Sequence, residues 1–119
     1  MLTPSKNQID AYTSIVYSMS MQETTTVPEF ERFDWSGGNA EKNWERHRVT
    51  PLEAEQVFFN SPLVSGADAA HSQEEQRFYA LGQTDEGREL FVVYTMRKRR
   101  LRVVSARGMS RKERRIYRS

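Results

Sequence analysis

The chain has 119 residues, a formal net charge of +2 and no cysteine. This length is typical of one domain with its own hydrophobic core, and the lack of cysteine excludes disulfide bridges and thiolate metal sites. The first residues lack the basic and then apolar pattern of a secretion signal, and no apolar run approaches the roughly 18 residues of a membrane span. We therefore expect a cytoplasmic protein that does not enter a membrane.

Charge is distributed unevenly along the chain. Residues 91–119 hold eleven basic residues and one acidic residue, whereas residues 1–90 hold seven basic and fifteen acidic residues. A basic patch attracts polyanions such as nucleic acid, and it gives affinity and fast encounter before any base is read. A run of charges is equally what a solvated surface contains, so this pattern alone leaves both interpretations open.

The N-terminal residues 1–28 differ in composition from the rest, being rich in Thr, Ser, Gln and Met. We expect an extension there, either a short helix or a loose tail, followed by one domain over residues 29–119. The extension holds a weak helical stripe formed by Ile9, Tyr12, Ile15, Val16 and Met19.

Short elements open the expected domain. The alternation of Phe30, Phe33 and Trp35 is typical of a short strand, which the glycines at 37 and 38 would end. Residues 39–47 have a helical pattern, with an apolar side that consists of Ala40, Trp44 and His47.

Two capping boxes mark further helix starts. Thr50 with Glu53, and Ser110 with Glu113, have the spacing at which a hydroxyl and a carboxylate satisfy the first free backbone N–H groups of a helix. In the first box Pro51 suits the first helical position, and the apolar side of that helix would hold Leu52, Ala54, Val57 and Phe58.

The stretch between these two boxes changes from helical to extended character. Four strands are expected around residues 63–64, 76–82, 90–96 and 101–107, with a turn at 84–87 whose glycine suits positive φ. Residues 90–94 are apolar on both faces, which places them centrally in the sheet. The prediction is a single α+β domain: a mainly antiparallel sheet of about four strands, two helices before it and one basic helix after it.

Several side chains are candidates for phosphate chemistry. Arg77 opens one expected strand and Arg107 closes another, and a guanidinium can hold a phosphate through two parallel donors. Tyr117 on the last helix is a candidate proton donor, base-stacking residue or packing residue. His47 and His71 are the two histidines, each either structural or catalytic, and no arrangement around them indicates a metal site.

The remaining basic residues suit general attraction of RNA better than chemistry. Arg97, Lys98, Arg99 and Arg100 read as an exposed hairpin turn, and Arg111 and Arg114 lie on the last helix. No phosphate-binding loop and no serine nucleophile motif is present. Metal-free cleavage remains open, because the RNA 2′-oxygen can attack its own phosphate when a base, a cation and an acid assist.

Four segments in this order resemble the BrnT family of type II toxins, whose fold is similar to that of the RelE-like ribonucleases. They are Phe33-Asp34-Trp35 with Asn43-Trp44-Glu45-Arg46-His47 and the helix at 52–59; His71 to Arg77 leading into Ala80-Leu81-Gly82; Phe91-Val92-Val93-Tyr94-Thr95; and Val103-Val104-Ser105-Ala106-Arg107 with Glu113-Arg114-Arg115-Ile116-Tyr117.

The resemblance implies a toxin that cleaves RNA without a metal ion or other cofactor and thereby inhibits translation. Its expected partner is a ribbon-helix-helix antitoxin of the BrnA type, which would itself bind operator DNA. His47, Arg77, Arg107 and Tyr117 are the expected catalytic residues, and Asn43, His71 and Glu113 match as supporting residues. The alternative is a non-catalytic module that binds nucleic acid, or a degenerate toxin in a repressor complex; Asn39 and Arg48, which depart from the family pattern, bear on this choice.

Overall fold

The computed structural model describes residues 15–17, 19, 26–68 and 75–119. His71 lies outside these residues. Residues 15–17 and 19 are helical, and the later elements are β1 (Arg32–Asp34), the 3-10 turn η1 (Ser36–Gly38), α2 (Asn39–His47), α3 (Pro51–Val57), β2 (Val64–Asp68), β3 (Arg77–Gln83), β4 (Glu89–Arg97), β5 (Arg100–Gly108) and α4 (Arg111–Tyr117).

One five-stranded sheet forms the centre of the domain, in the order β1-β5-β4-β3-β2. Strands β2 to β5 pair antiparallel, as predicted. The short β1 pairs parallel with β5 and makes the sheet mixed, which adds a fifth strand to the four expected after the helices. Strand β4 occupies the middle, which confirms the interpretation of its two-sided apolar pattern.

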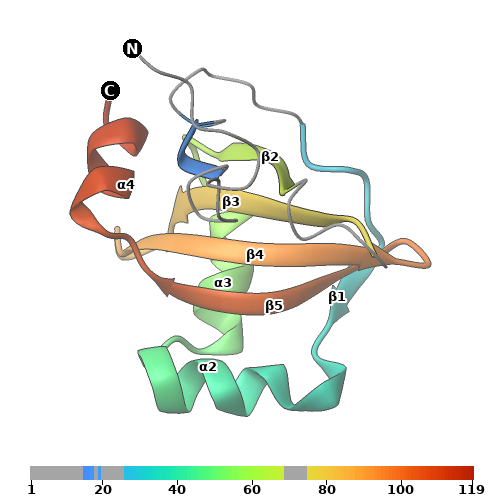
Figure 1. The fold of residues 1–119 in the computed structure, drawn as a ribbon. Helices are drawn as coiled ribbons and strands as arrows, with labels where there is room; N and C mark the ends of the chain where they lie inside the picture. The colour runs from blue at the N-terminus through green and yellow to red at the C-terminus, as the bar shows by residue number, and fades with distance from the viewer. Residues whose placement is uncertain (1–14, 18, 20–25, 69–74) are drawn as a thin grey trace, which may run out of the picture.

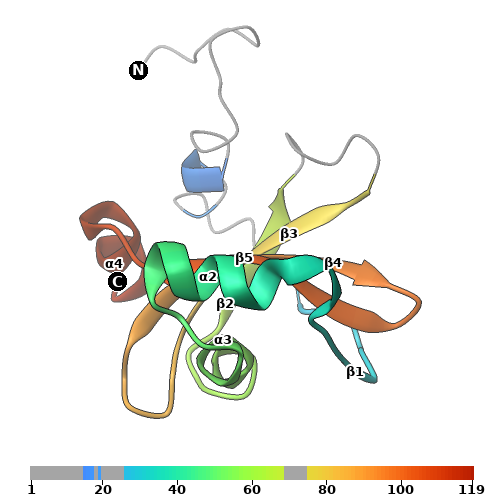
Figure 2. The ribbon, with the colours of Figure 1, turned by 90° about the horizontal axis from the view of Figure 1, so that it is seen from below.

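The sheet separates two layers, which are visible in Figure 1 and, from below, in Figure 2. Helices α2 and α3 cover one face, which we call the α2–α3 face, and Ala54 and Val57 are buried there. Helix α4 and the N-terminal residues 15–17 and 19 lie on the other, which we call the α4 face. The cluster on this second face is formed by Ile15, Met19, Tyr79, Leu81, Phe91, Met109 and Tyr117.

Helix α2 attaches to the sheet through two buried asparagines. Asn39 donates its amide to the carbonyl of Val103 at 3.0 Å, and the side-chain oxygen of Asn43 accepts from the N–H of Ala106 at 3.1 Å. Between Val103 and Ala106, the pairing of β5 with β4 is irregular. The two asparagines therefore hydrogen-bond to backbone groups of β5 that the ladder leaves unpaired. The prediction of an apolar packing side was therefore wrong for Trp44, which is 47% exposed.

Both capping boxes form as predicted. Thr50 and Glu53 cap α3, with Pro51 in its first turn, and Ser110 and Glu113 cap α4. The expected apolar side of α3 is confirmed for the two fully buried residues, Ala54 and Val57, but not for Leu52, which is 64% exposed.

Candidate functional site

Arg77 lies in a pocket on the α4 face. Its partner across the β2–β3 ladder is Asp68, whose side chain is almost fully buried, and opposite charges on such neighbours attract. The pocket has a volume of about 200 Å³ and is lined by Ile15, Asp68, Arg77, Phe91, Val93, Val104 and Ser105. It therefore combines a cation, a carboxylate and a hydroxyl above an apolar floor, which are groups that can bind and react with a phosphodiester.

Arg107 lies on the same face but at the other end of the strands. It donates from both terminal nitrogens to the carboxylate of Glu113, each at 2.8 Å, and its guanidinium lies 4.4 Å from the ring centre of Phe91. Glu113 is fully buried, and it also accepts from the backbone N–H of Ser110 at 2.8 Å. A phosphate approaching Arg107 would meet this carboxylate as well, so the geometry favours a positioning role over direct phosphate binding.

Tyr117 is engaged in packing. Its hydroxyl donates to the carbonyl of Pro62 at 2.6 Å, and the side chain is buried in the cluster on the α4 face. Burial raises the pKa of the Tyr117 phenol, and the nearby Glu89 carboxylate raises it further. The hydroxyl thus ties α4 to the segment before β2, and its raised pKa makes it a weaker acid.

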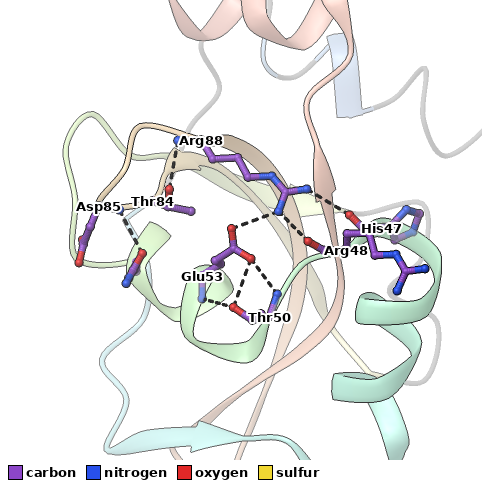
Figure 3. Close-up of polar contacts among 8 residues, drawn as sticks. His47, Arg48, Thr50, Glu53, Thr84, Asp85 and Arg88 are labelled. Atoms are coloured by element: carbon purple, nitrogen blue, oxygen red, sulfur yellow. Dashed lines mark hydrogen bonds and ion pairs between the residues drawn. The ribbon is translucent and has the colours of Figure 1, made fainter.

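His47 belongs to a different part of the molecule, at the end of α2 on the opposite side of the sheet. Its carbonyl accepts from Arg88 at 3.1 Å, and the carbonyl of Arg48 accepts from the same guanidinium at 2.7 Å (Figure 3). Arg88 also contacts the carboxylate of Glu53 at 3.1 Å. No motif in the sequence predicts this role of Arg88, which joins the end of α2 to the capping box of α3.

The charge on Glu53 is stabilised within this cluster. Burial would raise the pKa of its carboxyl, but the hydrogen bond from the backbone of Thr50 and the contact with Arg88 outweigh burial and lower it. Figure 3 shows Thr50 and Arg88 on two sides of this carboxylate. The cluster is a structural junction of two helices and the turn before β4, and His47 contributes its backbone to it.

The basic surface predicted to attract RNA is partly neutralised. Arg97, Arg99 and Arg114 form ion pairs with Glu75, Glu31 and Glu89, respectively. Within residues 15–17, 19, 26–68 and 75–119, ion pairs are absent for three others of the predicted set, Lys98, Arg100 and Arg111.

The predicted hairpin turn is present. Lys98 and Arg99 have positive φ angles of 48° and 65° between β4 and β5. Of the basic residues predicted to attract RNA, those without an ion pair in the described part of the chain lie at this tip and on α4, where they can attract a polyanion.

The predicted catalytic residues do not converge on one point. Arg77 pairs with Thr95 and Arg107 pairs with Phe91, so they lie about 13 Å apart along the strands and about 10 Å apart across them. His47 is on the other side of the sheet, and the supporting residue Asn43 is buried there. Arg77, Asp68 and Ser105 instead line one pocket, and Asp68 is the direct partner of Arg77 across the β2–β3 ladder.

Asp68 and Ser105 were missed because only the strand register places them in the same pocket as Arg77. Once β2 and β3 are known to pair, Asp68 at the end of one and Arg77 at the start of the other are an evident couple. The sequence separates them by eight intervening residues, six of which lie outside the described part, and no turn motif there fixes the register.

The side chains that the structure describes include no group of three or more His, Asp or Glu residues that could hold a metal ion. Among the helices of the described residues, every one is too short or too polar to cross a membrane.

The chain was also compared with known proteins. A family model described as "Ribonuclease toxin, BrnT, of type II toxin-antitoxin system" matches residues 35–113. This range runs from the residue after β1 to the capping glutamate of α4, and so includes Arg77, Asp68, Ser105 and Arg107. No curated protein sequence matched the chain.

Proposed function

Since the chain belongs to the BrnT ribonuclease toxin family of type II toxin–antitoxin systems, we propose that it is an endoribonuclease that cleaves RNA without a metal ion and thereby inhibits translation. The observation that carries the proposal is the pocket on the α4 face, where Arg77 lies with Asp68 and Ser105 inside the range matched by the family model. Arg77 can stabilise the charge on a phosphate and Asp68 can accept a proton, and RNA cleavage requires both functions.

The proposed reaction uses the RNA 2′-hydroxyl as nucleophile. Asp68 accepts the hydroxyl proton, the 2′-oxygen attacks the adjacent phosphorus, and the bond from phosphorus to the 5′-oxygen breaks. Arg77 stabilises the negative charge that develops on the phosphate oxygens, and water supplies the proton for the leaving 5′-oxygen. The products are a 2′,3′-cyclic phosphate end and a 5′-hydroxyl end.

The other residues predicted to be catalytic receive different roles. We propose that Arg107 orients Phe91 and the start of α4 through its contacts with that ring and with Glu113. Tyr117 fixes α4, and His47 contributes to the junction with Arg88. Lys98, Arg100 and Arg111 supply the sequence-independent attraction of RNA.

The test is cleavage of a labelled RNA by the purified protein in the presence of EDTA. Arg77→Ala should lower the cleavage rate by about 100-fold or more, as loss of a charge-stabilising donor does, and Asp68→Asn should lower it similarly. Arg46→Ala, at an exposed position of α2 on the opposite face of the sheet, is the matched control and should stay within about threefold of the parent.

Two results would contradict the proposed site. One is cleavage by Arg77→Ala at the parent rate. The other is a loss in His47→Ala as large as that expected for Arg77→Ala, provided that both variants melt like the parent, because it would move the chemistry to the opposite face. The product ends, read by mass spectrometry, check the 2′-oxygen mechanism independently.

A type II toxin implies a cognate antitoxin. We propose a ribbon-helix-helix antitoxin of the BrnA type, with operator DNA reached only through it and with action in the cytoplasm, where messenger RNA is translated. Induced expression should arrest growth, and coexpression of a neighbouring small reading frame should relieve the arrest. Arrest that only an antitoxin of another fold relieves would contradict this part.

A second candidate is a non-catalytic nucleic-acid-binding module, or a degenerate toxin that acts within a repressor complex. It is favoured because Arg107 is paired with Glu113 and the Tyr117 hydroxyl is bonded to the carbonyl of Pro62, so two of the predicted catalytic side chains already have protein partners. Binding of RNA without cleavage, together with normal growth on induction, would support this candidate over the first.

A further inference from the structure

The N-terminal segment supplies two buried side chains to the α4 face. Ile15 is 4% exposed and Met19 is 2% exposed. Both residues have helical backbone and are four positions apart, a spacing at which side chains share one side of a helix. Tyr17, between them, is 51% exposed. Both buried residues precede the range matched by the family model, which begins at residue 35.

These two side chains pack on the residues that surround the candidate site. They share one apolar cluster with Tyr79, Phe91 and Met109, and Ile15 also lines the pocket that holds Arg77. The segment thus lies over the middle of the sheet, between Arg77 at one end and α4 at the other. Figure 1 shows this short helical stretch, in blue, above β3 and β4.

The pocket beneath Ile15 is small. Its volume of about 200 Å³ is below the roughly 300 to 1,000 Å³ of pockets that take organic ligands. A nucleotide has the size of such a ligand, and the side chain of Arg77 is partly exposed. A phosphate can therefore touch Arg77 from the surface, but a whole nucleotide fits into the pocket only when the wall formed by Ile15 moves away. The same apolar side chains that bury the segment therefore oppose access to the site.

We propose that the segment carrying Ile15 and Met19 is a cover that acts in cis on the Arg77 pocket and limits access of RNA to it. The expected effect on RNA cleavage rests on the proposed function. The position of the cover rests on the burial of Ile15 and Met19 and on the place of Ile15 in the pocket lining. Because only the uncovered population binds, the apparent affinity for RNA falls by the fraction of molecules in which the pocket is open.

The experiment compares the full-length parent with the double variant Ile15→Asp/Met19→Asp. A buried carboxylate is costly, so the substitutions release the segment from the apolar cluster. The RNA cleavage rate at low substrate should rise at least about 10-fold. Tyr17→Asp adds the same charge to the exposed side of the same segment, and should leave the rate within about twofold of the parent.

A second readout does not depend on RNA cleavage. Phenylglyoxal modifies accessible arginine side chains, and mass spectrometry after digestion gives the rate at Arg77. That rate should rise at least about fivefold in the double variant and stay at the parent value in Tyr17→Asp. Arg111, away from the pocket on α4, serves as the internal standard.

The outcomes separate this inference from the proposed function. If the parent cleaves RNA but the double variant changes neither the rate of cleavage nor the rate of Arg77 modification, the cover is refuted and the ribonuclease assignment stands. If no protein cleaves RNA but modification of Arg77 rises, the cover is supported and the assignment fails. Should the double variant melt far below the parent, Ile15→Ala/Met19→Ala replaces it, with the same two rates and the same expected directions.

Discussion

The two capping boxes have the same local design but differ in what surrounds their glutamates. Glu53 and Glu113 each accept the backbone N–H of an N-cap residue, at 3.0 Å and 2.8 Å, and each also contacts an arginine. The side chain of Glu53 is 29% exposed, whereas that of Glu113 is 0% exposed. One motif of four residues can therefore place its glutamate at a partly exposed position or bury it completely as the partner of an arginine.

The arginines differ in the same way. Arg107 gives both terminal nitrogens to Glu113 and stacks on Phe91, which joins α4 to the face of the sheet. Arg88 gives one contact to Glu53 and the others to the carbonyls of His47 and Arg48, which joins α2 to α3. The first pair organises the candidate RNA side of the molecule, and the second organises the opposite side.

The largest expected effect is that of Glu113→Gln. It removes the charge of a fully buried carboxylate and weakens its two hydrogen bonds from Arg107, whose side chain is 28% exposed, at an expected cost of about 2–3 kcal/mol. The matched Glu53→Gln should cost about 1 kcal/mol or less, because a partly exposed pair is screened by water. Urea unfolding gives both free energies. Equal costs for the two variants would show that burial does not distinguish the boxes.

Arg88→Met should have the next largest effect. It keeps most of the aliphatic volume and removes the hydrogen bonds to two carbonyls and to Glu53, at an expected cost of about 1–2 kcal/mol in the free energy of unfolding. RNA cleavage should remain within about threefold of the parent, since the junction lies across the sheet from Arg77. Cleavage lost at unchanged stability would instead connect His47 with the chemistry.

Thr50→Ala and Ser110→Ala test the part that the boxes share. Each removes the hydroxyl that accepts from the N–H of its glutamate, at 3.1 Å and 3.2 Å. Each should cost about 1 kcal/mol, the usual value of an N-cap. Thermal or urea unfolding of both variants measures this. A much larger cost at Ser110 would mean that the hydroxyl also holds Glu113 in place for Arg107.

The smallest expected effect is on the pH dependence of stability. The pKa of Glu53 in the folded protein is below its ordinary value of 4.5, so its stabilising contribution is present above pH 4.5. The contribution is lost as the pH falls through the lowered pKa. Between about pH 5 and pH 3, Glu53→Gln should therefore lose less stability than the parent, by under about 1 kcal/mol. Unfolding curves at both pH values provide the check, and identical losses would contradict it.

The local elements were predictable because their signals lie within a few residues. The capping box of α3 closes over three residues, and so does that of α4. The apolar run of β4 predicts its central place because a strand buried on both faces carries no polar side. The family resemblance was also readable, because spacing along the chain is what a family pattern contains.

The candidate site was less predictable. Arg77 was identified from its type and its place at the start of a strand, but Asp68 and Ser105 join it only through the register of β2, β3, β4 and β5. Trp44 was expected to pack and does not, because two asparagines form the contact of α2 with β5. A buried side-chain amide that hydrogen-bonds to unpaired backbone groups of a strand leaves no periodic pattern in the sequence.

By itself, the sequence determined where the helices cap, which strand is central and which family the chain belongs to, since each depends on neighbours within a few positions or on linear spacing. Only the tertiary structure decided that Arg88 reaches Glu53 from 35 residues away, that Arg107 is held by a buried carboxylate, and that Ile15 lines the pocket of Arg77. Such partners are selected by the packing of the two layers on the sheet, because burial and strand register bring together side chains that the chain itself keeps apart.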